Sequence, residues 1–160
     1  MITVLFGQPC SGKTTLAKEL ENALCSLQQN NSIIIDGDQI RTLFKNNNYG
    51  LLGRATNHQN AINIAIFNHS IGSDVIISMM FPYITFREEL IKQAELIDAP
   101  LHFFYLHYDK QNERRGREQY HLEDFETPAK KELNSGLFTE LNTGELSTQD
   151  CIKKILHVIL

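Results

Sequence analysis

The sequence is poor in cysteine, with only Cys10, Cys25 and Cys151 among 160 residues. Their number is odd and no two of them form a C-x-x-C pair, so neither a disulfide framework nor a zinc site is indicated. The chain also lacks an apolar run near the roughly 18 residues of a membrane span, and no charged leader precedes its first apolar run. We therefore expect a cytoplasmic protein with no membrane partner.

Positive charge is scarce as well, because 15 Lys and Arg stand against 19 Asp and Glu, for a net charge of -4. A chain with this balance has no broad cationic surface, which disfavours nucleic acid as a partner and favours a small anionic ligand. With 42% hydrophobic residues, the chain has enough apolar material for one core. The sequence predicts a single domain over 1–160, and it allows a homodimer without demanding one.

Apolar runs alternate with stretches of helical spacing, a pattern typical of a parallel sheet whose helices cover both faces. We predict an α/β fold with a five-stranded, mostly parallel sheet. The segments 46–54 and 116–133 resist regular structure, so they either line a ligand site at the carboxyl ends of the strands or form ordinary surface loops. The expected strands are 2–6, 32–35, 75–79, 101–106 and 138–141. The expected helices are 13–29, 40–46, 56–70, 83–97, 110–118 and 148–159, the last with Ser147 as its N-cap.

Residues 7–14 spell G-x-x-x-x-G-K-T and stand between the first expected strand and the first expected helix. In such a turn, backbone amides and the positive end of the helix are aimed at phosphate oxygens, which indicates a nucleoside triphosphate ligand. Lys13 would reach the β- and γ-phosphates, and Thr14 would ligate Mg²⁺. The alternative is an ordinary glycine turn. The predicted ATP-binding residues of this loop are Gly7, Pro9, Cys10, Ser11, Gly12, Lys13, Thr14 and Thr15.

Two carboxylates, Asp36 and Asp38, follow the second expected strand at the same sheet edge as the glycine-rich loop. A carboxylate at this place can orient or deprotonate an acceptor hydroxyl, or hold Mg²⁺ through water, and Asp38 is the candidate for that work. The alternative is that both residues form a turn and cap the next helix, with Asp36 the more structural of the two. The third strand has no terminal Asp or Glu, which argues against a large ATP-driven motor and for a compact small-molecule kinase.

Four segments together resemble the adenylylsulfate (APS) kinase family, a group of P-loop kinases. They are G-x-x-x-S-G-K-T-T-L-A at 7–17, D-G-D-x-x-R at 36–41, G-x-x-x-R-x-x-N at 50–57 and N-T-G-E-L-S at 142–147. The resemblance spans nearly the whole chain. It implies transfer of the γ-phosphate of ATP to the 3′-hydroxyl of APS with the help of Mg²⁺.

The resemblance also assigns roles, with Asp38 as the catalytic aspartate beside Lys13. Arg114 and Arg117 would belong to a basic lid over the phosphates of ATP, although they also suit a solvated helix end. Arg41 and Arg54 carry guanidinium groups that bind anions bidentately, or they form surface ion pairs instead. Asn57 would bind the nucleotide substrate or cap a helix. The residues predicted to bind the acceptor are Asp36, Asp38, Arg41, Arg54, Asn57, Met80, Phe81 and Phe125.

The chain departs from the family in the acceptor region. Phe81-Pro82-Tyr83-Ile84 stands where the family has Ser-Pro-Phe-Arg, so one expected anionic contact is lost. The segment before Arg54 lacks the family's stacking phenylalanine, for which Tyr49 or Phe81 would have to substitute. The acceptor is therefore APS, or another nucleotide conjugate such as a CDP derivative, or a small hydroxyl metabolite. A nucleotide-binding regulatory switch is the non-kinase alternative, although the chain has no N-K-x-D sequence.

Overall fold

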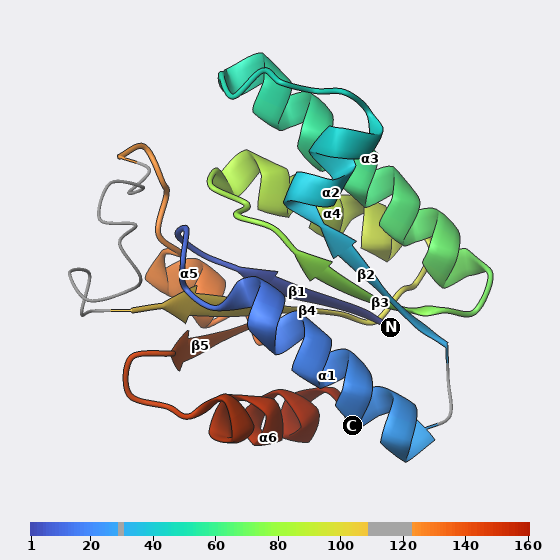
Figure 1. Cartoon of the computed structure of the whole chain (residues 1–160), viewed down its shortest axis with the longest axis vertical. Coiled ribbons are helices and arrows are strands. Elements are labelled where there is room, and N and C mark those ends of the chain that lie inside the picture. The colour runs from blue at the N-terminus through green and yellow to red at the C-terminus, as the bar shows by residue number, and fades with distance from the viewer. Residues whose placement is uncertain (29–30, 109–122) are drawn as a thin grey trace.

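The computed structural model describes residues 1–28, 31–108 and 123–160, which build one five-stranded parallel sheet covered by helices (Figure 1). The strand order is β2-β3-β1-β4-β5, and all four neighbouring pairs run parallel. The expected α/β fold with five strands is thus confirmed. The strands are β1 (Ile2–Phe6), β2 (Ser32–Asp36), β3 (Asp74–Ser78), β4 (Leu101–His107) and β5 (Phe138–Asn142).

The helices form two layers, with α1 and α6 on one face of the sheet and α2, α3 and α4 on the other (Figure 1). Side chains of β1 alternate between the two layers, as the period of a strand requires. Ile2, Val4 and Phe6 enter the core beneath α3 and α4, whereas Leu5 packs with α1 and α6. The helices are α1 (Lys13–Gln28), α2 (Gly37–Leu43), α3 (Leu51–Ser70), α4 (Ile84–Leu96), α5 (Lys130–Leu133) and α6 (Thr148–Ile159).

The strand order places the candidate site at the middle of the sheet. After β1 the chain adds β2 and β3 on one side, and then β4 and β5 on the other. The order therefore reverses at β1, and in open α/β sheets ligands bind at the carboxyl ends of the strands near such a reversal. The glycine-rich loop leaves β1 at this point, and β2 ends there in Asp36.

Several helix boundaries differ from the expectation. The helix α2 begins at Gly37 because Asp36 caps it, and α3 begins at Leu51, so part of the segment 46–54 is helical. The short helix α5 lies within the segment 116–133, which was expected to be irregular. The helix over 148–159 and its cap Ser147 are confirmed, since Ser147 Oγ accepts a hydrogen bond from the Asp150 amide at 3.1 Å. The expected helix 110–118 falls outside the described residues.

Among the helices that the structure describes, none combines the length and the apolar character that crossing a bilayer requires.

Candidate active site

The loop over residues 7–12 has a backbone that demands glycine at its start. Gly7 has a φ of 145°, and a Cβ at this position would lie 2.1 Å from the carbonyl oxygen of Leu106. Gly12 and Cys10 also have positive φ values, of 95° and 63°. The helix α1 starts directly afterwards at Lys13. Because the first amides of a helix have no intrahelical acceptor and stand at its positive end, this loop has the form of a phosphate cradle.

Lys13 extends its ammonium group back into this loop. Its Nζ atom donates hydrogen bonds to the carbonyl oxygens of Gly7 at 3.0 Å and Gln8 at 2.7 Å, and it lies 3.4 Å from Ser11 Oγ. Burial lowers the pKa of Lys13 to about 8, while Asp36 and Asp38 act in the opposite direction. The cation therefore stands where a polyphosphate held by the loop would need it.

Thr14, the next residue of α1, lies against the end of β2. Its hydroxyl donates to Asp36 Oδ2 at 3.1 Å and is 3.5 Å from Ser78 Oγ, at the end of β3. An exposed hydroxyl next to a carboxylate is an all-oxygen donor set, which suits Mg²⁺. No group of three or more His, Cys, Asp or Glu within the described residues could hold a metal ion.

The two aspartates differ in what their side chains do. Asp36 Oδ1 accepts hydrogen bonds from the amides of Asp38 at 3.0 Å and Gln39 at 3.3 Å, so Asp36 is the N-cap of α2. The carboxylate of Asp38 is exposed and has no hydrogen bond or ion pair with any described residue. The capping alternative therefore holds for Asp36, and Asp38 keeps a free carboxylate close enough to Lys13 to act on its pKa.

Arg41 and Arg54 also differ in their partners. Arg41 Nη1 donates to the carbonyl oxygens of Asn46 at 3.3 Å and Asn48 at 2.9 Å, and its guanidinium lies 4.4 Å from the centre of the Tyr49 ring. Arg54, in the first turn of α3, has no ion pair and no side-chain hydrogen bond within the described residues. Neither arginine is thus the surface ion pair that was the alternative. Arg41 shapes the loop before α3, and Arg54 has its donors available.

Asn57 lies in the second turn of α3, which excludes the expected alternative of a helix cap. The residue is buried, and its Nδ2 atom donates to the carbonyl oxygen of Gly37 at 3.1 Å. Its Oδ1 atom is buried and has no hydrogen-bond partner among the residues that the structure describes. Asn57 thereby ties α3 to the start of α2, next to Asp38.

The neighbouring residue His58 was not singled out from the sequence. It is 4% exposed and stacks on Phe86, with ring centres 4.4 Å apart, while Phe81 meets its ring edge-on at 4.8 Å. Its Nδ1 atom is 2.7 Å from the carbonyl oxygen of Arg54, so Nδ1 carries the proton. Burial lowers the pKa of His58 to about 4. No local signal identified it, because a histidine within a helix looks the same whether it faces core or solvent.

Three residues expected to contact the acceptor belong to the scaffold of the site. Phe81 is fully buried, and Phe125 is 9% exposed with its ring parallel to that of Tyr105. Neither ring therefore offers a free face to a base, so the expected contacts of Phe81 and Phe125 with the acceptor are not supported. Met80 is half-buried, and its carbonyl oxygen accepts from the Gly7 amide at 3.4 Å. Tyr49, the other residue named for stacking, is 62% exposed.

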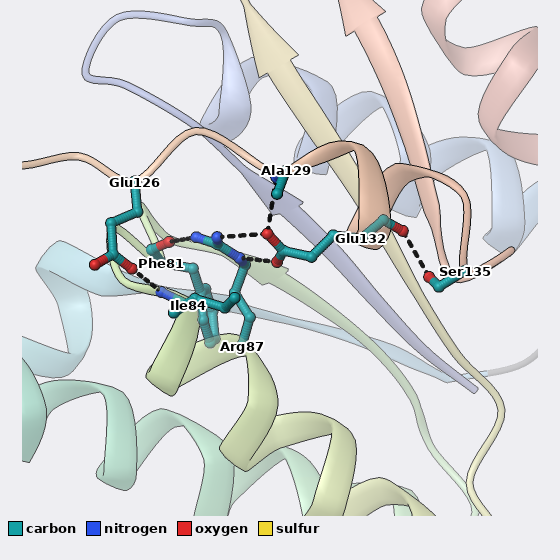
Figure 2. A network of polar contacts seen from close by, with 7 residues as sticks. All are labelled: Phe81, Ile84, Arg87, Glu126, Ala129, Glu132 and Ser135. Atoms are coloured by element: carbon teal, nitrogen blue, oxygen red, sulfur yellow. Dashed lines mark hydrogen bonds and ion pairs between the residues drawn. The ribbon is translucent and has the colours of Figure 1, made fainter.

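A buried ion pair stands behind the site and was also missed from the sequence (Figure 2). Arg87 is fully buried in α4, and its guanidinium binds the Glu132 carboxylate through Nε at 2.7 Å and Nη2 at 3.1 Å. Its Nη1 atom donates to the carbonyl oxygen of Phe81 at 2.9 Å. The remaining predicted residues, Arg114 and Arg117, lie outside the described residues.

The chain is similar to known proteins in sequence and in fold. The sequence model of the adenylylsulphate kinase family matches residues 1–122. The structure of the Mycobacterium tuberculosis APS kinase CysC in complex with AMPPNP and APS is similar over 99% of this chain and 96% of that one, with a TM-score of 0.80 and 18% identity. No curated protein sequence matches the chain.

Two other solved structures share the fold. Chaetomium thermophilum Kti12 in complex with ADP-AlF3 is similar over 100% of both chains, with a TM-score of 0.71 and 16% identity. A gluconokinase from Sinorhizobium meliloti is similar over 98% of this chain and 89% of that one, with a TM-score of 0.66 and 16% identity. At such low identity these likenesses show the fold alone, and proteins with different acceptors share it.

Proposed function

The chain belongs to the adenylylsulphate kinase family, and from this premise we propose that it is an ATP-dependent kinase acting on a hydroxyl of a nucleotide-like acceptor. The first candidate for the accepting group is the 3′-hydroxyl of adenylylsulfate. ATP and Mg²⁺ are the proposed cofactors. The transfer forms a bond between the acceptor oxygen and the γ-phosphorus, breaks the bond to the β-phosphate bridge, and releases ADP.

The free carboxylate of Asp38 is the observation that carries this proposal. It stands at the carboxyl end of β2, with its charge acting on Lys13, and no described residue engages it. In a pure nucleotide-binding switch such a carboxylate would have no partner and no task. In a kinase it accepts the proton of the attacking hydroxyl, while Lys13 and the first amides of α1 hold the β- and γ-phosphates.

The residues at the loop also fit a magnesium ion. The hydroxyl of Thr14 would be a direct ligand, and the carboxylate of Asp36, whose Oδ2 atom is 3.1 Å away, would hold a metal-bound water. The ion would neutralise charge on the phosphates during transfer.

The acceptor would bind between Asp38 and the start of α3. Arg54 offers unengaged guanidinium donors there for an anionic group, and the exposed ring of Tyr49, backed by Arg41, offers a surface for a base. This arrangement favours an acceptor that carries both a base and an anionic group.

Release of ADP from ATP, measured with and without candidate acceptors, tests the proposal. Lys13→Ala should abolish acceptor-dependent release, because its ammonium is the cation of the phosphate loop. Lys18→Ala is the matched control, since Lys18 lies on the same helix and is exposed. Turnover that does not depend on any acceptor would support a regulatory switch instead. If Lys13→Ala and Lys18→Ala were equally active, the glycine-rich loop would have no part in the mechanism.

A second acceptor class is favoured by the start of α4. Ile84 is present where the resemblance expects an arginine, and its amide donates to the Glu126 carboxylate. An apolar side chain and a carboxylate at this point disfavour the extra anion that APS carries. Another nucleotide conjugate, such as a CDP derivative, or a small hydroxyl metabolite is therefore the second candidate. The same assay separates them, since only one acceptor of a panel should stimulate ADP release.

A further inference from the structure

Residues 124–132, which we call the strap, are fastened to the turn after β3 and to the first turn of α4 by four polar contacts, of which Figure 2 shows those to Ile84 and Arg87. The Tyr83 hydroxyl donates to Asp124. The Glu126 amide donates to the carbonyl oxygen of Pro82 at 2.7 Å, and the Glu126 carboxylate accepts from the Ile84 amide. The fourth contact joins Glu132 to Arg87 and is the most deeply buried.

Arg87 is the one side chain of this set that reaches three parts of the molecule. Besides Glu132 of the strap, it binds the Phe81 carbonyl oxygen and lies over the ring of Phe6, 5.5 Å from its centre. Phe6 is the last residue of β1, directly before the glycine-rich loop. Arg87 therefore links the strap, the turn after β3 and the base of the phosphate cradle.

The turn that Arg87 holds has an unfavourable backbone. Phe81 has a φ of 43°, a left-handed conformation that bulky residues rarely adopt, so neighbouring contacts must maintain it. From Phe81 the contacts continue to the acceptor side, because its ring meets His58, and His58 binds the carbonyl oxygen of Arg54. A shift of Phe81 would therefore move the residue proposed to bind the acceptor.

Stability alone does not explain a buried pair of this kind. Replacing a buried ion pair by apolar residues of similar volume is often neutral or stabilising, because desolvation offsets the attraction between the charges. An apolar pair cannot, however, donate to the Phe81 carbonyl group or accept from the Ala129 amide, which Glu132 binds at 3.0 Å. Compared with an apolar pair, the ion pair therefore adds directional hydrogen bonds.

We propose that Arg87 and Glu132 are a positioning pair, which holds the strap and the turn at residues 80–83 together and thereby sets the affinity for the acceptor rather than for ATP. This inference rests on the proposed kinase function. It assigns the pair no contact with the substrate.

The test compares the wild-type protein with the double variant Arg87→Met/Glu132→Leu, in which two apolar side chains replace the pair. We expect the acceptor KM to rise about tenfold or more, with kcat at saturating acceptor and the Kd of a non-hydrolysable ATP analogue changed by less than about threefold. Glu132→Gln keeps an oxygen acceptor and should give an intermediate KM. Lys153→Met, which removes the exposed pair with Asp150, is the control and should leave all three constants unchanged.

Amide hydrogen exchange supplies a readout that needs no activity. In the double variant, exchange should become faster in residues 80–84 and 124–133 and stay unchanged in the phosphate loop bound to the ATP analogue. Unchanged exchange in residues 80–84 and 124–133 overturns the inference. A double variant with the wild-type acceptor KM, or one that binds the acceptor and the ATP analogue equally more weakly, also overturns it. Wild-type protein without acceptor-dependent ADP release overturns the proposed function instead, and exchange then still decides whether the pair fastens the strap.

Discussion

Thr14 Oγ1 and Asp36 Oδ2 are joined by a hydrogen bond of 3.1 Å, which connects the first turn of α1 to the cap of α2. The other oxygen of the same carboxylate accepts hydrogen bonds from the amides of Asp38 and Gln39. One side chain thus fixes the starts of two helices at the carboxyl edge of the sheet. Asp36 is committed to this work, whereas the carboxylate of Asp38, two residues later, has no partner among the described residues, as its proposed catalytic role requires.

The two aspartates should therefore respond differently to substitution. Asp36→Ala should lower the free energy of unfolding by about 1 kcal/mol, since it removes the N-cap of α2. Asp38→Asn should leave that free energy unchanged and lower kcat by roughly 10²- to 10⁴-fold, the range of general base catalysis. Urea unfolding and steady-state kinetics measure the two effects. A destabilised Asp38→Asn with normal kcat per folded molecule would show that Asp38 is structural.

The fold was predictable because its signals are local. The apolar runs that became β1 to β4, the glycine-rich loop and the cap at Ser147 each depend on neighbouring residues. The start of α3 depends on a contact at longer range, since Asn46 donates to the carbonyl oxygen of Gly53 and thus closes the loop over the first helical turn. A run of asparagines therefore looked like a loop up to residue 54, although the helix begins at Leu51.

The site was predictable only where a motif fixes it. Arg87 and Glu132 are 45 residues apart in the sequence, and no spacing rule pairs them. The family resemblance places Phe125 at the acceptor, and Phe81 is a candidate there because an aromatic ring can stack on a base, but both rings fill the core. Whether such a side chain faces a ligand or the interior is decided by tertiary packing, which composition does not reveal.

Arg54 and Arg41 provide a matched comparison at the acceptor side. Arg54→Ala should raise the acceptor KM about 10- to 100-fold, the worth of charged hydrogen bonds, with no loss of stability, because no described residue depends on its guanidinium. Arg41→Ala should raise the KM and also destabilise the loop at Asn46 and Asn48, whose carbonyl oxygens it binds. Thermal unfolding and acceptor titrations distinguish the two. An equal loss of stability in Arg54→Ala and Arg41→Ala would contradict the assignment of Arg54 to acceptor binding and of Arg41 to the loop.

Lys13 should couple ATP binding to proton uptake. Its pKa is lowered to about 8 by burial, so in the free protein the group loses its proton as the pH rises through 8. A bound polyphosphate favours the ammonium form and raises this pKa, so binding at about pH 9 should take up protons. Calorimetry in two buffers of different ionisation enthalpy measures the uptake. In Lys13→Arg it should disappear, because guanidinium stays charged at this pH.

His58 should make the fold sensitive to acid. Burial, with smaller contributions from Arg41 and Arg54, lowers the pKa of His58 to about 4 from an ordinary value of 6.5. Between these two values the unfolded chain binds a proton that the folded chain does not, so the free energy of unfolding falls as the pH drops from 6.5 to 4. The loss attributable to this residue is on the order of 3 kcal/mol.

The comparison of wild type with His58→Phe isolates this contribution, because carboxylates titrate equally in both proteins. Phenylalanine keeps the stacking on Phe86 but loses the hydrogen bond to the Arg54 carbonyl oxygen, so the variant should be less stable at pH 7. As the pH falls below 6.5, this difference in the free energy of unfolding between wild type and His58→Phe should narrow and then reverse. The reason is that only the wild type must keep a histidine in its core unprotonated. His157→Gln, an exposed control on α6, should follow the wild-type curve. If the stability difference between wild type and His58→Phe were constant with pH, His58 would not be held neutral by its surroundings.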